Sequence, residues 1–406
     1  MPETPERAQQ ELGLQIMLGA ALGATQGQQA VGHIYTRACE LARQGGSTPE
    51  LFAALWGLWY AHIAQGQMPT ARALAADYLE LARRQRDPLV LAAGHRMLAN
   101  TAWWQGTLKD ARDHSREGLA IYNPEQHRAS LVRYGQDSGV CCGWIQALTK
   151  WVLGYPDQAV HSMDETLARA RALAHPFSEA QTLLFSAHLY QLLREPQAAR
   201  ARAEEALALC IEHGFEAYRT WCLLPRGWAE AQQGRAIEGV ADIHEALDAR
   251  HATGAKAVLP WFYTVLGEAY GQAGNVDDGL RAVEEALGWV KHNDEHLYEA
   301  EAFRQKGQLL LEQGAANAAE AEECFRRAMN IAHRQQARSW ELRAAMSITR
   351  LRYEQGNRRR PKVLAAVYDW YSEGFDTADL RDGKALIAET EKAAKALGRT
   401  ITNEVT

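Results

Sequence analysis

The apolar and polar positions along this chain follow the spacing of α-helices rather than that of β-strands. No turn dipeptide is flanked by alternating apolar residues, which would indicate a hairpin of strands. Helical segments alternate instead, one of about 15 residues and one of about 17 in each pair. The second helix of a pair carries charged residues on an expected solvated face, as in residues 199–206. The pattern predicts an all-α protein.

These helices recur with a fixed period. A glycine or polar turn closes the first helix of each pair, at Gly66, Gly106, Gly154, Arg194, Gly234, Gly274, Gly314 and Gly356. Most of these turns are 40 residues apart, and one interval is 48. Small residues stand seven positions before the turns, at Ala99, Ala147, Ala187, Gly227, Gly267 and Gly307. The period predicts stacked helical hairpins, and the small residues predict where neighbouring helices touch.

The best-preserved units carry a recognisable motif. Residues 266–270 read Leu-Gly-Glu-Ala-Tyr, and the matching positions that follow are Gly274, Gly279, Val283 and Ala286. The motif recurs at Gly227, Gly234, Gly239, Ile243 and Ala246, and again at Gly307, Gly314, Phe325 and Ala328. It resembles the tetratricopeptide repeat (TPR), although the period of 40 residues exceeds the 34 usual for that repeat. The resemblance implies a right-handed α-solenoid of about nine hairpins.

Arrays with such long helices are similar to the C-terminal sensor regions of bacterial ATPase, adenylate-cyclase-type and MalT-like signalling proteins. Residues 134–137, 154–159, 175–178 and 373–377 add to this likeness. The resemblance implies a TPR-like superhelix over residues 8–370. A C-terminal capping helix is assigned to residues 371–400, with its start expected after the N-cap pair Asp376 and Thr377, and the termini at 1–7 and 401–406 are expected to be flexible. The resemblance also implies an ATPase or cyclase module as a possible partner. The chain has no Walker motif of its own, so we expect an excised region or a stand-alone derivative.

One face of the first helices is rich in aromatic and polar side chains. In TPR stacks this face lines the concave surface. Here it is formed by Trp56, Tyr60, Arg96, Asn100, Trp103, Trp144, Trp151, Gln181, His188, Gln191, Trp221, Trp228, Trp261 and Glu268, followed by Glu301, Arg304, Gln308, Arg343 and Arg350. We call this set the inner stripe. Exposed aromatics with a few polar anchors predict a ligand-binding groove. The alternative is that the indoles fill space between helices.

The period breaks once, in the connection of residues 122–139. Loops on rigid scaffolds often carry functional residues. Gln136 and Asp137 are therefore candidates for a lid or a polar anchor over the groove. The alternative is a longer connection with no role.

Composition narrows the function further. The 406 residues are 47% hydrophobic and 23% charged, with a net charge of −6. This balance gives no basic footprint for nucleic acid, and no run of 18 apolar residues predicts a membrane span. The polar N-terminus predicts no signal peptide, so a cytoplasmic protein is expected. No metal or cofactor is expected, because zinc-ligand spacing is missing from the six cysteines, which we expect to be buried free thiols: Cys39, Cys141, Cys142, Cys210, Cys222 and Cys324.

The sequence favours a non-catalytic TPR binding module, a sensor or scaffold that holds a small ligand or a partner segment in the aromatic groove. One alternative is an adaptor that grips an extended peptide and uses Arg343 and Arg350 for its acidic groups. A second alternative is an enzyme in the groove with His188 or Asp137 as acid or base. No catalytic triad, paired carboxylates or phosphate-binding loop supports that interpretation.

Overall fold

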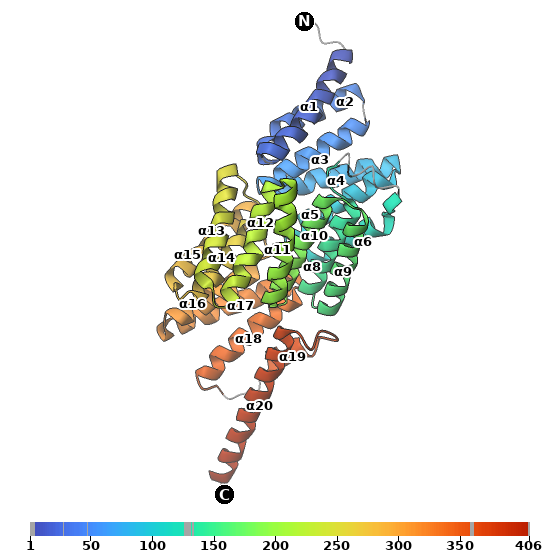
Figure 1. Ribbon diagram of the computed structural model, residues 1–406. Helices are drawn as coiled ribbons and strands as arrows, with labels where there is room; N and C mark the ends of the chain where they lie inside the picture. The colour runs from blue at the N-terminus through green and yellow to red at the C-terminus, as the bar shows by residue number, and fades with distance from the viewer. Residues whose placement is uncertain are drawn as a thin grey trace.

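The computed structural model describes residues 5–26, 28–46, 48–125, 131, 134–357 and 361–404, and no strand occurs in that part of the chain (Figure 1). Its elements are α1 (Pro5–Gln26), η1 (Gln28–Ala30), α2 (Gly32–Gly45), α3 (Thr48–Ala64), α4 (Met68–Gln85), α5 (Pro88–Trp104), α6 (Leu108–Ile121), α8 (Ser138–Val152), α9 (Pro156–Ala172), α10 (Pro176–Leu192), α11 (Pro196–His213), α12 (Glu216–Gln232), α13 (Ala236–Thr253), α14 (Leu259–Gln272), α15 (Val276–Asn293), α16 (Glu299–Gln313), η2 (Ala315–Asn317), α17 (Ala318–Gln335), α18 (Arg338–Glu354), α19 (Lys362–Tyr368) and α20 (Ala378–Glu404).

Consecutive helices pair as antiparallel hairpins, and the hairpins stack. The first helices of the pairs, α3, α5, α8, α10, α12, α14, α16 and α18, also contact one another in this order and form an inner layer. The second helices lie outside them. This arrangement confirms the expected all-α solenoid of TPR-like hairpins. Helices α1 to α3 lie at one end of the molecule and α18 to α20 at the other (Figure 1).

The periodic turns have the backbone geometry that explains their composition. Gly66, Gly106 and Gly274 have φ values of 70°, 69° and 76°, in the left-handed region that glycine adopts without a steric penalty. Arg194 takes the same conformation with φ of 62° despite its side chain. The turn signal in the sequence is therefore a backbone requirement at these turns, whereas Gly314 ends α16 with an extended backbone, at a φ of 161°.

The small residues that share a phase do lie where helices touch. A Cβ atom on Gly267 would stand 2.5 Å from Cγ2 of Val283 and 3.1 Å from the carbonyl oxygen of Gly279 in the partner helix α15. At Gly227 the nearest atom would be the Gly239 carbonyl oxygen, at 2.6 Å. Each of these hairpins thus brings two backbones into contact, as the sequence predicts.

The superhelix also contacts itself between hairpins that are far apart in the sequence. Carbonyl oxygens at the C-terminal ends of α3, α5, α8 and α10 each accept a hydrogen bond from a later unit. Ala64 accepts from the backbone N–H of Lys256 at 2.9 Å, and Trp104 accepts from that of Leu297 at 3.2 Å. Trp151 accepts from Ser339 Oγ at 2.5 Å, and Leu192 accepts from Arg343 Nη2 at 2.5 Å. These bonds satisfy carbonyls that a helix end leaves free, and they bring the inner helices together across a common interior.

The predicted boundaries need small changes at the chain ends. The final helix α20 begins at Ala378, directly after Asp376 and Thr377 as expected, and residues 371–377 form a connection before it. Residues 5–7 belong to α1 and residues 401–404 to α20, so these parts of the expected flexible termini are helical. The remaining terminal residues, 1–4 and 405–406, lie outside the described residues. So do 126–130 and 132–133 of the long connection.

Candidate functional site

The tryptophans of the inner stripe are buried or half-buried. The side chains of Trp56, Trp103, Trp144, Trp151, Trp228 and Trp261 have exposed fractions of at most 6%, and Trp221 is half-buried. The expected exposure of these indoles on an open groove is therefore wrong. The physical reason is the contact between distant hairpins, which turns the inner faces of the helices toward one another. Ligand binding by these residues is a separate question and stays a prediction.

Aromatic rings from distant hairpins form a continuous chain of stacked, tilted and edge-to-face contacts in the interior, which we call the interior stack. The Trp261 ring lies on His188, with ring centroids 4.0 Å apart and an interplanar angle of 20°. Trp104 stacks on the same indole at 6.1 Å. The ring centroid of Tyr298 lies 6.2 Å from that of Trp261 and 5.8 Å from that of Trp340. The Trp340 ring in turn contacts Trp151, with centroids 5.0 Å apart. The stack therefore connects α5, α10, α14, α16, α18 and α8.

His188 lies in this stack and is a neutral side chain. Its Nε2 shares a hydrogen bond of 2.6 Å with the Tyr298 hydroxyl, and its Nδ1 has no partner among the described residues. Burial lowers the pKa of His188 to about 3 because the charged imidazolium loses its hydration. The structure places this residue away from solvent, where proton exchange with a substrate would first require access.

Arg96 is the most unusual polar residue of the inner stripe. Its guanidinium is 3% exposed and lies over the indole of Trp56, 4.2 Å from the ring centroid. The Nη2 group donates to Oε1 of Gln136, but Nε and Nη1 have no hydrogen-bond partner in the described part of the chain. A buried charge normally has an oppositely charged or fully hydrogen-bonding partner. Arg96 thus carries two donors that remain available.

Polar and aromatic side chains connect Arg96 to the surface. Gln136 donates from Nε2 to the hydroxyl of Tyr60 at 3.5 Å, and Tyr60 is half-buried. Gln181 donates from Nε2 to the hydroxyl of Tyr218 at 2.8 Å, and Tyr218 is also half-buried. The Cys141 thiol lies 3.8 Å from Oε1 of Gln136 and 3.1 Å from Oε1 of Gln181 and so joins the two pairs. The structure therefore brings together Tyr60, Arg96, Gln136, Gln181 and Tyr218, which we call the Arg96 cluster.

A second buried arginine lies near the Arg96 cluster. Arg250 on α13 is 5% exposed, with its guanidinium 4.8 Å from the Trp221 ring centroid and 5.1 Å from that of Phe262. It donates to the carbonyl oxygen of Ala257 at 2.5 Å, while its Nε has no partner among the described residues. Burial lowers the pKa of Arg250 to about 10, which still leaves it cationic at neutral pH. The aromatic cluster at this end of the interior thus holds two cations.

Other predicted site residues cap a helix or pack against neighbouring side chains. Asp137 is fully buried, caps α8 by accepting from the backbone N–H of Val140 at 2.8 Å, and accepts from the Tyr122 hydroxyl at 3.0 Å. Trp144 stacks on Phe185 with centroids 3.7 Å apart. Asn100 is half-buried on α5. Asp137 is therefore positioned as a helix cap rather than as a lid.

Two further polar residues of the inner stripe lie in the interior. Gln191 is buried, and its Oε1 has no hydrogen-bond partner in the described part of the chain. Glu268 accepts from Nε2 of Gln232 at 2.9 Å, and burial raises the pKa of its carboxyl group. Together with Arg96 and His188, these residues place polar groups in an interior that is otherwise largely aromatic.

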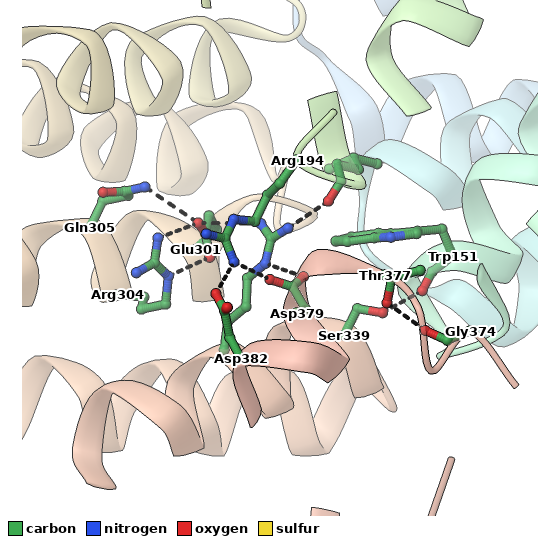
Figure 2. Close-up of polar contacts among 12 residues, drawn as sticks. Trp151, Arg194, Glu301, Arg304, Gln305, Ser339, Gly374, Thr377, Asp379 and Asp382 are labelled. Atoms are coloured by element: carbon green, nitrogen blue, oxygen red, sulfur yellow. Dashed lines mark hydrogen bonds and ion pairs between the residues drawn. The ribbon is translucent and has the colours of Figure 1, made fainter. Parts of the chain in front are cut away.

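The C-terminal end of the inner stripe is charged (Figure 2). Glu301 receives two hydrogen bonds from Arg304, at 2.9 and 2.7 Å. Arg343 pairs with Asp379 at 2.7 Å, and Arg194 pairs with Asp379 and Asp382 at 3.1 and 2.7 Å. The two aspartates belong to α20. The inner stripe is therefore aromatic at one end and ionic at the other.

Several residues that matter here were missed in the sequence. Tyr218, Tyr298 and Trp340 stand one helical turn further from the periodic turns than the inner stripe was taken to extend, so a longer stripe would have found them. Trp104 and Arg250 carry no such signal. Trp104 is out of phase with the stripe, and Arg250 belongs to an outer helix.

Other possible sites are few. No group of three or more histidine, cysteine or acidic residues that could hold a metal occurs in the described residues. A surface pocket of about 440 Å³ lies beside α9, lined among others by Asp157, His161, Asp164 and Glu195, and it includes no residue of the inner stripe. All six cysteines are buried free thiols, as expected. No described helix has the length and apolar character needed to cross a membrane.

Comparison with known proteins supports the fold and leaves the family open. No family model matches the chain. An uncharacterized protein of Rhizobium meliloti (strain 1021) is 24% identical over 327 residues, which are 78% of this chain and 31% of the relative. The chain thus spans about a third of the length of that curated relative.

Two solved structures share the architecture over almost the whole chain. One is a Rap protein complexed with competence and sporulation factor, which has a TM-score of 0.60 and 10% identity and covers 94% of this chain and 100% of that chain. The other is the Rap conjugation gene regulator of the plasmid pLS20 in complex with the Phr* peptide, with a TM-score of 0.53 and 10% identity, covering 95% of this chain and 97% of that chain. The chain is similar in fold to these TPR-like helical proteins.

Proposed function

We propose that this chain is a non-catalytic regulatory binding module that recognises an anionic group of its ligand, most simply a peptide carboxylate, at the Arg96 cluster. The observation that carries the proposal is the buried guanidinium of Arg96, which has two nitrogen atoms without a hydrogen-bond partner among the described residues. A carboxylate accepts strong, charge-assisted hydrogen bonds from guanidinium nitrogens of this kind. The ligand would thereby complete the hydrogen bonding of a residue that the fold leaves incomplete.

The surroundings of Arg96 suit such a ligand. The face of the guanidinium lies on Trp56, which orients the group and leaves its N–H edge available. Tyr60 and Tyr218 are half-buried at the side of the cluster and offer hydroxyl groups and ring surfaces. An aromatic wall with few polar anchors is typical of a small-ligand or peptide site. The cluster is enclosed in this structure, so binding requires a local displacement of these side chains.

The comparison supports a peptide as the first choice among anionic ligands. One protein with a similar fold is in complex with the Phr* peptide and another with competence and sporulation factor. At 10% identity these similarities establish the fold alone, and a peptide ligand for this chain is our proposal. A small anionic molecule would meet the same chemistry at Arg96. An ATPase or cyclase module as signalling partner is the second part of the proposal, and the greater length of the Rhizobium meliloti relative is compatible with it.

A selection experiment tests the carboxylate requirement. The full chain is incubated with a pool of random hexapeptides with free C-termini, and retained peptides are identified by mass spectrometry. A second pool is amidated and contains no acidic side chains. We expect retention from the first pool only. Retention of both pools in equal amounts would contradict carboxylate recognition.

Two arginine variants locate the site. Arg96→Gln keeps a polar side chain and removes the charged fork, so the retained peptides should bind at least about tenfold more weakly, because a hydrogen bond to a charged group typically contributes about 1.5–3 kcal/mol. Arg83→Gln is the matched control, since Arg83 is an exposed arginine on the outer helix α4. Thermal unfolding checks that both variants fold. Equal binding by the two variants would place the ligand elsewhere.

A further inference from the structure

The ionic end of the inner stripe is covered by a segment of the same chain. Helix α20 begins at Ala378 and places Asp379 and Asp382, one helical turn apart, against arginines of two inner helices or their turns (Figure 2). Arg343 Nε lies 2.7 Å from Asp379 Oδ2, and Arg194 Nη1 lies 2.7 Å from Asp382 Oδ2. Arg350 Nη2 is 4.0 Å from the same Asp382 oxygen. An acidic helix start thus lies on a basic surface.

The two aspartates of the segment offset most of the positive charge of this surface. Arg194, Arg343 and Arg350 face the two aspartates, and the nearest other carboxylate of this set, Glu301, is 3.8 Å from Arg343 and already receives two hydrogen bonds from Arg304. Without Asp379 and Asp382 three arginines would share one carboxylate that is committed elsewhere. Such a surface attracts anionic groups of the right spacing.

Apolar contacts give the surface a shape as well as a charge. Leu380 and Leu386 of α20 are 1% and 6% exposed and pack with Leu342 and Met346 of α18. The segment that fits is therefore defined by two acidic residues one turn apart, Asp379 and Asp382, and by two apolar residues, Leu380 and Leu386. The segment is an amphipathic helix with two aspartates one turn apart on its docked face, while the basic residues Arg381 and Lys384 are exposed.

We propose that the surface formed by Arg194, Arg343, Arg350, Leu342 and Met346 is a binding site for amphipathic helices that present two carboxylates one turn apart, and that α20 is its built-in occupant. A partner protein with such a helix competes with α20 for the surface. Because α20 is tethered, its effective concentration at the surface is high. The partner therefore binds measurably only when its binding free energy exceeds that of α20 docking, or when the docking of α20 is weakened. This inference does not use the Arg96 cluster, so either proposal can fail while the other stands.

The test separates the docked segment from the surface. In the full chain, Asp379→Lys and Asp382→Lys together place two cations against the arginines. We expect hydrogen exchange of α20 to accelerate while the inner helices stay protected. Glu389→Lys is the matched control, because Glu389 is exposed further along the same helix. It should leave α20 protected.

The freed surface is then offered the natural sequence in trans. The probe is a synthetic peptide of residues 376–394, labelled at its N-terminus and followed by fluorescence anisotropy. The double lysine variant should bind it at least about tenfold more tightly than the unchanged chain does. A peptide with both aspartates replaced by asparagine, or a receptor that also carries Arg343→Gln, should bind at least about tenfold more weakly.

Three results would overturn the inference. The first is unchanged protection of α20 in the double lysine variant, which would mean that the ion pairs do not hold it. The second is a released α20 with no binding of the peptide. The third is binding that does not depend on Arg343. Should the double variant not fold, Asp382→Lys alone answers the same questions, since this side chain is 38% exposed and tolerates the change better.

Discussion

The contact between α14 and α15 offers a sharp test of how the hairpins pack. Gly267 on α14 faces α15, and a Cβ at this position would lie 2.5 Å from Cγ2 of Val283 and 3.1 Å from the carbonyl oxygen of Gly279. Gly288, on α15, is exposed, and a Cβ there would meet no such atom within 4 Å. Both glycines are helical. The same substitution at the two positions therefore separates packing from helix propensity.

The two expected magnitudes have opposite signs. Leucine favours a helix over glycine by about 0.8 kcal/mol, so Gly288→Leu should leave the free energy of unfolding unchanged or raise it by about that amount. At Gly267 the new side chain meets a backbone oxygen and a valine, and neither can withdraw easily, because valine has a restricted χ1 angle. Overpacking of this kind costs about 1–3 kcal/mol. Gly267→Leu should lower the free energy of unfolding by that amount.

Urea unfolding followed by far-ultraviolet circular dichroism measures both effects. We expect a lower midpoint for Gly267→Leu and an equal or higher midpoint for Gly288→Leu. Gly267→Ala adds only the Cβ atom that meets Val283 and should also lower the free energy of unfolding. Adding Val283→Ala to this variant removes the closer of the two contacts and should recover part of that stability, which a double-mutant cycle measures. If Gly267→Leu unfolds at the same urea concentration as the unchanged chain, the two helices do not approach as described.

Three further perturbations test other parts of the structure. Trp144→Ala should cost about 3–5 kcal/mol in calorimetry, because the indole is 2% exposed and stacked on Phe185, while Trp370→Ala, at a residue 38% exposed, should cost much less. The pKa of His188 is about 3 in the folded state and near 6.5 in the unfolded state. The free energy of unfolding should therefore fall by about 2 kcal/mol between pH 6.5 and pH 5, because the unfolded state takes up a proton there, and His188→Gln should remove this pH dependence. Asp137→Ala should cost about 0.5–2 kcal/mol through loss of the α8 cap, and an unchanged melting temperature would argue against that role.

Much of the candidate site could be named from the sequence, although its environment could not. Tyr60, Arg96, Gln136 and Gln181 all belong to positions singled out by the repeat or by its one long connection, and the structure brings them together. Their enclosure was not foreseen. Tyr218 could have been found by extending the same periodic position along the helix. Arg250 could not, since an arginine on an outer helix usually faces solvent.

The amino-acid sequence is sufficient to predict the helices, the hairpins and the contacts within each hairpin. These depend on neighbours in the chain: a left-handed turn residue at Gly66 or Gly274, and a backbone contact at Gly267. How tightly the superhelix coils cannot be predicted from these local patterns. That coiling is the sum of small rotations from hairpin to hairpin. It is completed by contacts such as Trp104 with Trp261 and Ser339 with the Trp151 carbonyl, between residues with no local relation. For this reason a stripe that predicts an exposed groove in the sequence becomes the buried interior of the protein.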